Sequence, residues 1–235
     1  MTQLTIDLYA DGADVSDMIA ARESGLVRGF TTNPTLMRKS GITDYEAFAR
    51  EALRAVAGMP ISFEVFADEF DEMERQARLI ATWGDGVFVK IPITNTRGDS
   101  SLPLIHRLSS AGVKLNVTAI LTLDQVRGVA EALAKDVPTI VSVFAGRIAD
   151  TARDPIPLMT EALANLRERP AARLLWASPR ELLNIFQADA CGCHIITVTP
   201  EILKKMSMVG MSLEELSLET VKMFYNDAAA AGYVL

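Results

Sequence analysis

The chain has 235 residues, of which 49% are apolar and 23% charged, and this composition is typical of a globular protein with enough apolar residues for a sizeable core. Its net charge of -7 argues against nucleic acid as a partner, because binding to phosphate backbones favours a basic face. A membrane partner is also not expected, since no uninterrupted apolar run approaches the ~20 residues of a membrane span and the N-terminus lacks the features of a signal peptide.

Strand-like and helix-like segments alternate along the chain. Short apolar runs predict strands at residues 4–10, 29–33, 60–67, 86–94, 113–120, 138–146, 172–178 and 193–199. Apolar residues that recur every three or four positions predict helices within residues 44–58, 71–84, 121–136 and 154–170. Eight strands, each followed by a helix, predict an α/β fold that closes into a single (β/α)8 TIM barrel, and the length is close to the ~250 residues typical of one. A doubly wound sheet fits less well, because no G-x-G-x-x-G turn follows the first strand.

The segment after the eighth unit predicts one extra helix, at about residues 212–232. Such a helix either covers the barrel or reaches a neighbouring subunit. No linker or change of composition suggests a second domain, so we expect residues 1–235 to form one barrel domain.

Two cysteines, Cys191 and Cys193, are separated by a single residue. That spacing gives poor disulfide geometry and indicates a reducing compartment. We therefore expect a cytoplasmic protein.

Polar residues stand late in nearly every predicted strand, where the active sites of such barrels lie. We expect the functional residues among these positions, which are Asp11, Asp14, Asn33, Glu64, Lys90, Asn116, Thr118, Ser142, Phe144, Arg147, Ser178, Arg180, Thr197 and Thr199.

Lys90 stands out because it is the centre of the otherwise apolar run "GVFVKIPIT". Burial disfavours the charged ammonium, and a neutral amine can attack a carbonyl to form a Schiff base, whose iminium accepts electrons when a neighbouring carbon–carbon bond breaks. Asp11 is a candidate for the base that accepts the proton of the substrate hydroxyl group. Glu64 and Thr118 are candidates for positioning the water that takes part in forming and hydrolysing the imine. The alternative is a structural ion pair between Lys90 and Asp11 or Glu64.

Arg147 and Arg180 follow the sixth and seventh predicted strands, and Ser178 lies beside the start of the next helix. Guanidinium groups and helix N-terminal amides suit a phosphate, which barrels often bind at their later strands. The alternative for each arginine is an ordinary place on the surface.

The two histidines do not favour other chemistries. His106 lies on the helix expected after the fourth strand, and His194 lies at the start of the eighth strand, at the opposite end of the barrel from the expected site. We therefore expect no metal centre with imidazole ligands and no Ser-His-Asp triad.

These motifs carry a family resemblance. In the order and spacing of "DLYADGAD", "GFTTNPTLM" and "VFVKIPIT", the chain resembles the transaldolases, and in particular their short branch that includes fructose-6-phosphate aldolase. The resemblance extends over essentially the whole chain. It implies a barrel with the Schiff-base lysine on the fourth strand, and it implies no cofactor.

The resemblance also implies a role for each candidate residue. Lys90 corresponds to the Schiff-base lysine and Asp11 to the general acid/base, while Glu64 and Thr118 correspond to the pair that positions the catalytic water. The substrate-binding residues would be Asn33 and Asn116 at the sugar hydroxyls, Ser142 and Phe144 in the lining, and Arg147, Ser178 and Arg180 at the phosphate. One departure is Pro179, where the family usually has an aromatic or similar residue.

Two positions separate the branches of the family. The aldolases typically have glutamine at the position of Glu64 and tyrosine at that of Phe144, so this chain matches the transferases. The resemblance thus implies transfer of a dihydroxyacetone unit between phosphorylated sugars, in the pentose phosphate route or in a specialised pathway. The alternatives are an aldolase that releases free dihydroxyacetone and a non-catalytic barrel that binds a phosphosugar. Short members of the family also imply a homo-oligomer, a pentamer or decamer that uses the terminal helix.

Overall fold

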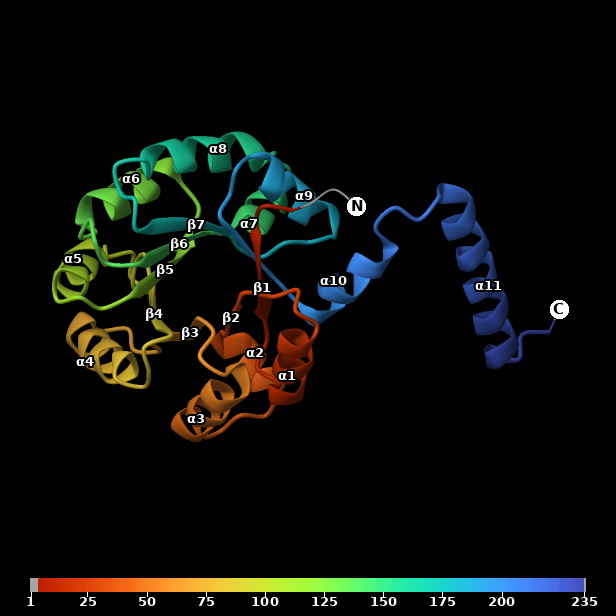
Figure 1. Cartoon of the computed structure of the whole chain (residues 1–235), viewed down its shortest axis with the longest axis horizontal. Helices are drawn as coiled ribbons and strands as arrows, with labels where there is room; N and C mark the ends of the chain where they lie inside the picture. Colours follow the sequence, from red (N-terminus) through yellow and green to blue (C-terminus); the bar gives the residue numbers. More distant parts are fainter. Residues whose placement is uncertain (1–3, 235) are drawn as a thin grey trace.

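The fold is a closed barrel of eight parallel strands, described here from a computed structural model for residues 4–234. Each strand pairs with its neighbour in chain order and β8 pairs with β1, which closes the barrel (Figure 1). The predicted TIM barrel is confirmed. The strands are β1 (Asp7–Asp11), β2 (Gly29–Thr31), β3 (Ile61–Glu64), β4 (Val87–Pro92), β5 (Leu115–Ile120), β6 (Thr139–Val143), β7 (Ala172–Trp176) and β8 (Ile195–Val198).

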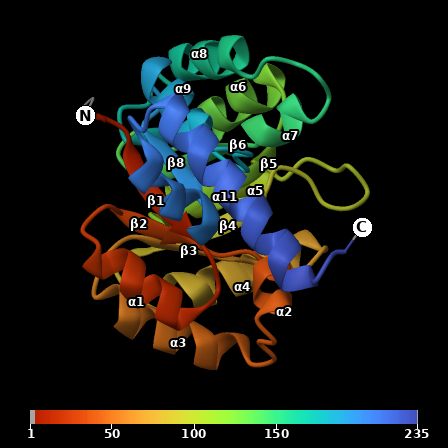
Figure 2. The same ribbon diagram turned by 90° about the vertical axis from the view of Figure 1, so that its right-hand side faces the viewer.

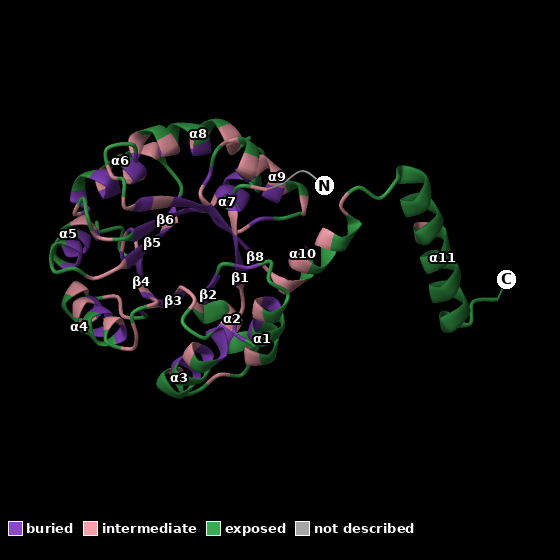
Figure 3. Ribbon diagram, in the orientation of Figure 1, coloured by how far each residue is buried: buried purple, intermediate pink, exposed green. Residues whose placement is uncertain are grey.

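Helices form the outer layer around this barrel. Their buried faces turn toward the strands and their exposed faces toward solvent, as the colours of Figure 3 show. The outer helices are α1 (Val15–Glu23), α3 (Tyr45–Val56), α4 (Phe70–Ala81), α5 (Leu102–Ser110), α6 (Leu123–Ala132), α8 (Ile156–Asn165), α9 (Leu183–Ala190) and α10 (Pro200–Lys204), the last continued by a 3-10 turn at Lys205–Met208.

The local sequence explains these helices, and α3 is an example. The Asp44 side chain caps the helix by accepting a hydrogen bond from the backbone N–H of Ala47 at 2.9 Å. Phe48, Ala52 and Val56 recur at intervals of four residues and are all buried, because this spacing places them on the face that packs on the barrel.

Two short helices, α2 (Pro34–Lys39) and α7 (Ala145–Ala149), were not expected from periodicity. They directly follow β2 and β6, so β6 ends at Val143 and not at residue 146. Five or six residues make too few turns to display an amphipathic pattern. Both helices bring residues from after a strand to the open end of the barrel.

The other end of the barrel is closed by packing. Tyr9, Ile140, Leu175 and Ile195 are buried inside the barrel and fill its interior, and a Cβ on Gly29 would stand 2.5 Å from the Tyr9 ring, so glycine allows the ring to pack there. The imidazole Nδ1 of His194 accepts the backbone N–H of Leu174 at 2.9 Å. This contact gives His194 a structural role at the end away from the site.

Helix α11 (Leu213–Ala231) projects away from the barrel at the C-terminal end of the chain (Figure 1), and in the view of Figure 2 it lies in front of the barrel. It is capped at both ends, by a reciprocal pair of hydrogen bonds between Ser212 and Glu215 and by Gly232 in the left-handed conformation. None of its residues is buried, although its sequence is rich in apolar side chains. Among residues 4–234, no helix is long and apolar enough to cross a membrane.

Candidate active site

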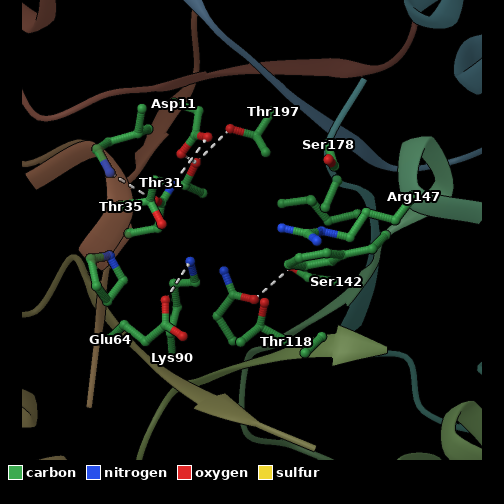
Figure 4. Close-up of a pocket in the computed structure, with 18 of the residues that line it drawn as sticks. Asp11, Thr31, Thr35, Glu64, Lys90, Thr118, Ser142, Arg147, Ser178 and Thr197 are labelled. Atoms are coloured by element: carbon green, nitrogen blue, oxygen red, sulfur yellow. Dashed lines mark hydrogen bonds and ion pairs between the residues drawn. The ribbon is translucent and has the colours of Figure 1, made fainter. Parts of the chain in front are cut away.

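A cavity of about 490 Å³ opens at the C-terminal end of the strands. Side chains from every side of the barrel point into it, and Lys90 and Arg147 approach it from opposite sides (Figure 4). All the residues that the sequence marked as catalytic or substrate-binding line this cavity, namely Asp11, Asn33, Glu64, Lys90, Asn116, Thr118, Ser142, Phe144, Arg147, Ser178 and Arg180.

Lys90 is only 7% exposed and lies beside Glu64, its partner in register on the neighbouring strand. Its Nζ is 3.0 Å from Oε2 of Glu64 and donates a hydrogen bond of 2.8 Å to the backbone carbonyl of Thr32. The ion pair expected in the structural alternative is therefore present, but it faces the cavity. A carboxylate at this distance can also take a proton from the ammonium and free the amine.

Asp11 ends β1 and points into the same cavity. Its Oδ1 accepts a hydrogen bond of 2.7 Å from the hydroxyl of Thr31, and its Oδ2 lies 3.4 Å from Nδ2 of Asn33. Burial raises the pKa of Asp11, while the positive charge of Lys90 and these two hydrogen bonds act in the opposite direction. Asp11 is thus a buried carboxyl group with one loosely held oxygen, which suits a base.

Asn33 is oriented by the start of α2. Its Oδ1 accepts the backbone N–H of Leu36 at 3.0 Å and caps the helix, and Pro34 occupies the first helical position, where no N–H is required. Because the oxygen is occupied, the amide nitrogen is the end that faces Asp11 and the cavity.

Thr118 is turned toward the cavity by an irregularity in β5. The pairing with β6 shifts between Val117 and Ile120, and Ala119 takes a left-handed φ of 62°. Bulges of this kind re-aim side chains near active sites. Thr118 is 2% exposed, and its hydroxyl has no hydrogen-bond partner among residues 4–234. A buried hydroxyl without a partner fits a place for a bound water.

Asn116 is held on both sides by hydroxyl groups. The Ser142 hydroxyl donates to its Oδ1 at 2.6 Å, and its Nδ2 donates to Ser62 at 3.0 Å. One N–H of the Asn116 amide remains for a substrate hydroxyl.

The arginine end of the cavity depends on close contact between α7 and the segment after β7. A Cβ on Gly146 would lie 1.6 Å from the backbone carbonyl oxygen of Ser178, so this approach requires glycine. Ser178 itself has a left-handed φ of 62°. The contact joins α7, which carries Arg147, to the segment that carries Arg180, and both arginines line the cavity.

The two arginines are held differently. The guanidinium of Arg147 lies over the ring of Phe144, with its Cζ 5.5 Å from the ring centroid. Arg180 donates from Nε to Oδ1 of Asp150 at 2.9 Å and from Nη2 to Oδ2, while its Nη1 donates to the Ser178 hydroxyl at 3.0 Å. Asp150 was not expected from the sequence.

The structure differs from two other expectations. Helix α9 begins at Leu183 and so does not start beside Ser178, and the backbone N–H of Arg180 is taken by the Asn184 side chain at 2.7 Å. Asp14 caps α1 by accepting the backbone N–H of Ser16 at 2.8 Å and does not line the main cavity. Both side chains satisfy backbone groups that helix starts leave without partners.

Thr31 is a further functional candidate that was not among the positions predicted from the sequence. It stands opposite Asp11 in the β1–β2 pairing and lines the cavity. Its place in "TTNPT", two residues before Asn33, was the available signal.

Comparisons with known proteins identify the family to which the chain belongs. The family model described as Transaldolase/Fructose-6-phosphate aldolase matches residues 8–234. The chain is 35% identical to the probable transaldolase 2 of Listeria monocytogenes, over 84% of this chain and 87% of that protein. It is 33% identical to the probable transaldolase of Thermoanaerobacter sp., over 91% of this chain and 94% of that protein.

A solved structure supports the fold alone. A protein from Burkholderia cenocepacia J2315 named as a lyase/mutase superposes with a TM-score of 0.60 at 16% identity, over 88% of this chain and 81% of its own. The family model matches nearly the whole chain, and the curated relatives are 33–35% identical over most of it. The chain therefore belongs to the transaldolase/fructose-6-phosphate aldolase family and is an enzyme of the transaldolase type.

Proposed function

We propose that this protein transfers a dihydroxyacetone unit from a ketose phosphate to an aldose phosphate through a Schiff base on Lys90. The observation that carries the proposal is the amine of Lys90, 7% exposed, at 3.0 Å from the Glu64 carboxylate inside a cavity that also holds Asp11. The family supports phosphorylated sugars as substrates.

The first step forms the imine. Glu64 takes a proton from the Lys90 ammonium, and the free amine attacks the ketone carbon of the donor. Glu64 returns the proton to the hydroxyl group of the resulting carbinolamine, this group leaves as water, and a protonated imine remains. The position of Glu64 beside Lys90 and the Thr118 hydroxyl, which has no partner among the described residues, support a role for both in holding this water and returning it for the final hydrolysis.

The second step breaks the carbon–carbon bond. Asp11 takes the proton of the hydroxyl group on the carbon beyond the scissile bond, the bond electrons move to the iminium, and an aldehyde leaves. The three carbons that remain on Lys90 are an enamine. When an acceptor aldehyde enters, the enamine attacks its carbonyl carbon, Asp11 returns the proton to the new hydroxyl, and hydrolysis releases the product ketose.

The far end of the sugar lies toward the arginines. Arg147 presents its guanidinium on the side of the cavity opposite Lys90 (Figure 4), and Arg180 lines the same cavity with a hydrogen bond to the Ser178 hydroxyl, so we assign the phosphate to this end.

The choice of transfer over release depends on how readily the enamine is protonated. A tyrosine in the lining could supply or relay that proton, whereas Phe144 has no exchangeable proton. We therefore expect fructose 6-phosphate to be consumed slowly alone and much faster once an aldose phosphate is added.

The test is to measure dihydroxyacetone released and ketose transferred, with and without acceptor. Release as fast as transfer would mean an aldolase. Binding of the phosphosugar with no turnover in either assay would mean a non-catalytic barrel.

We also propose that the chain acts as one domain, residues 1–235, within a homo-oligomer such as a pentamer or decamer. The exposed apolar side chains of α11 support an intersubunit contact, since a wide apolar face without a partner is costly in water. A cytoplasmic location, in the pentose phosphate route or a specialised sugar pathway, is supported by the free thiols of Cys191 and Cys193.

A further inference from the structure

Two threonine hydroxyl groups form a chain of hydrogen bonds that ends on Asp11. Thr31 lies opposite Asp11 on β2, and Thr197 lies opposite Tyr9 on β8, so the chain crosses three neighbouring strands. The Thr31 hydroxyl is 2.7 Å from Oδ1 of Asp11 and 2.6 Å from the Thr197 hydroxyl. Both threonines are buried, at 3% and 6% exposure.

Each threonine hydroxyl group has a single proton to donate, and this determines which group is the donor in each of these hydrogen bonds. An ionised carboxylate can only accept hydrogen bonds, so Thr31 must give its single proton to Asp11. The Thr31 oxygen is then an acceptor, and Thr197 must donate to it. Protonation of Asp11 on Oδ1 would reverse both bonds, with Asp11 donating to Thr31 and Thr31 donating to Thr197.

We propose that Thr31, backed by Thr197, is a positioning residue that keeps Asp11 ionised and reserves Oδ2 as the oxygen that receives the substrate proton. This inference rests on the proposed function of Asp11 as the base. Oδ2 is the free oxygen because its only hydrogen-bond contact among the described residues is the long one of 3.4 Å to Asn33.

Other charged groups around Asp11 act in both directions. Inside the cavity, Lys90 favours the ionised carboxylate and Glu64 opposes it. On the outer side, Asp14, Asp17 and Lys204 line a smaller cavity that also reaches Asp11. None of these groups donates a hydrogen bond to Oδ1, so the Thr31 hydroxyl has a contribution of its own.

The experiment compares pH profiles of kcat/KM for donor cleavage. Thr31→Val keeps the shape of the side chain and removes the hydroxyl, so the acid limb should move to higher pH by about one unit, because a hydrogen bond to the ionised form is lost. Activity on the acid side should then fall about tenfold, since a shift of one pKa unit is a factor of ten in the ionised fraction. Thr31→Ser should restore the wild-type limb. Thr197→Val should move it in the same direction by less, because Thr197 acts through Thr31.

A second measurement separates this inference from the proposed function. Dihydroxyacetone forms an imine on the lysine without any bond cleavage, and borohydride traps it. The wild type and Thr31→Val should give the same amount of adduct. No adduct in the wild type would overturn the proposed function, and with it the role of Asp11 on which this inference rests.

If adducts form equally but the acid limbs of wild type and Thr31→Val coincide, the inference is wrong although the function stands. If Thr31→Val fails to fold, Thr197→Val becomes the test. An acid limb of its pH profile that coincides with that of the wild type would contradict the proposed chain of hydrogen bonds.

Discussion

The Asp150 carboxylate holds the guanidinium of Arg180 along one edge, with Nε donating to Oδ1 over 2.9 Å and Nη2 donating to Oδ2. The third nitrogen, Nη1, donates to the Ser178 hydroxyl at 3.0 Å. A guanidinium held in this way has a fixed plane and keeps N–H groups on its Nη nitrogens for a ligand. Asp150 therefore orients the arginine that we assign to the phosphate.

Arg180→Ala should raise KM for a phosphorylated acceptor by about 10- to 100-fold, because a charge-assisted contact is lost. KM for an unphosphorylated acceptor such as glyceraldehyde should change little, since it never made this contact. Arg153→Ala is the matched control, because Arg153 is exposed and lies outside the cavity. Equal losses for both acceptors would transfer the phosphate role to Arg147.

Gly146→Ala should damage the same end of the cavity without changing a polar group. The added methyl group would overlap the Ser178 carbonyl oxygen, so the segment carrying Ser178 and Arg180 must move. We expect a loss of about 1–3 kcal/mol in the free energy of unfolding, as in other overpacked sites, together with a higher KM for phosphorylated acceptors.

Thermal unfolding and steady-state kinetics measure these two effects. Gly84→Ala is the control, because its new Cβ would meet only ordinary contacts of 3.8 Å or more. A Gly146→Ala protein with wild-type stability and KM would show that the close approach is unimportant.

The sequence predicted the strands and the positions that line the site because both follow from simple rules. Apolar runs identify buried strands, and in a parallel barrel the carboxyl ends of all strands meet at one end, which brings Lys90 and Asp11 together. The pairing of Arg180 with Asp150 and the bulge at Ala119 follow no such rule. They depend on how loops from different strands pack, which single-sequence patterns do not encode.

Phe144→Tyr should shift the enzyme from transfer toward release. A tyrosine hydroxyl beside the enamine supplies an exchangeable proton, so protonation and hydrolysis compete better with attack on the acceptor. The ratio of free dihydroxyacetone to transferred ketose should rise. Phe66→Tyr is the control, because Phe66 is 67% exposed and lies outside the main cavity. An unchanged ratio in Phe144→Tyr would show that residue 144 does not control this choice.

Removal of the apolar face of α11 should break the assembly but leave the barrel folded. Leu218, Val221 and Tyr225 follow at helical spacing and are 54%, 61% and 74% exposed. Their replacement by serine, or truncation before Ser212, should lower the mass measured by light scattering.

The control for α11 is Lys222→Gln, which changes a charged residue of the same helix and should leave the mass unchanged. A triple-serine variant with the wild-type mass and an intact fold would contradict the intersubunit role.

Formation of the Schiff base on Lys90 is tested directly by reduction with borohydride in the presence of fructose 6-phosphate, followed by peptide mass mapping. We predict a three-carbon dihydroxyacetone adduct on Lys90, because the aldehyde fragment leaves after cleavage. Lys90→Arg should abolish the adduct, since a guanidinium stays charged and cannot form the imine, whereas Lys114→Arg, at the closed end of the barrel, should retain it. An adduct on another lysine, or no adduct at all, would contradict the assignment of Lys90 as the Schiff-base lysine.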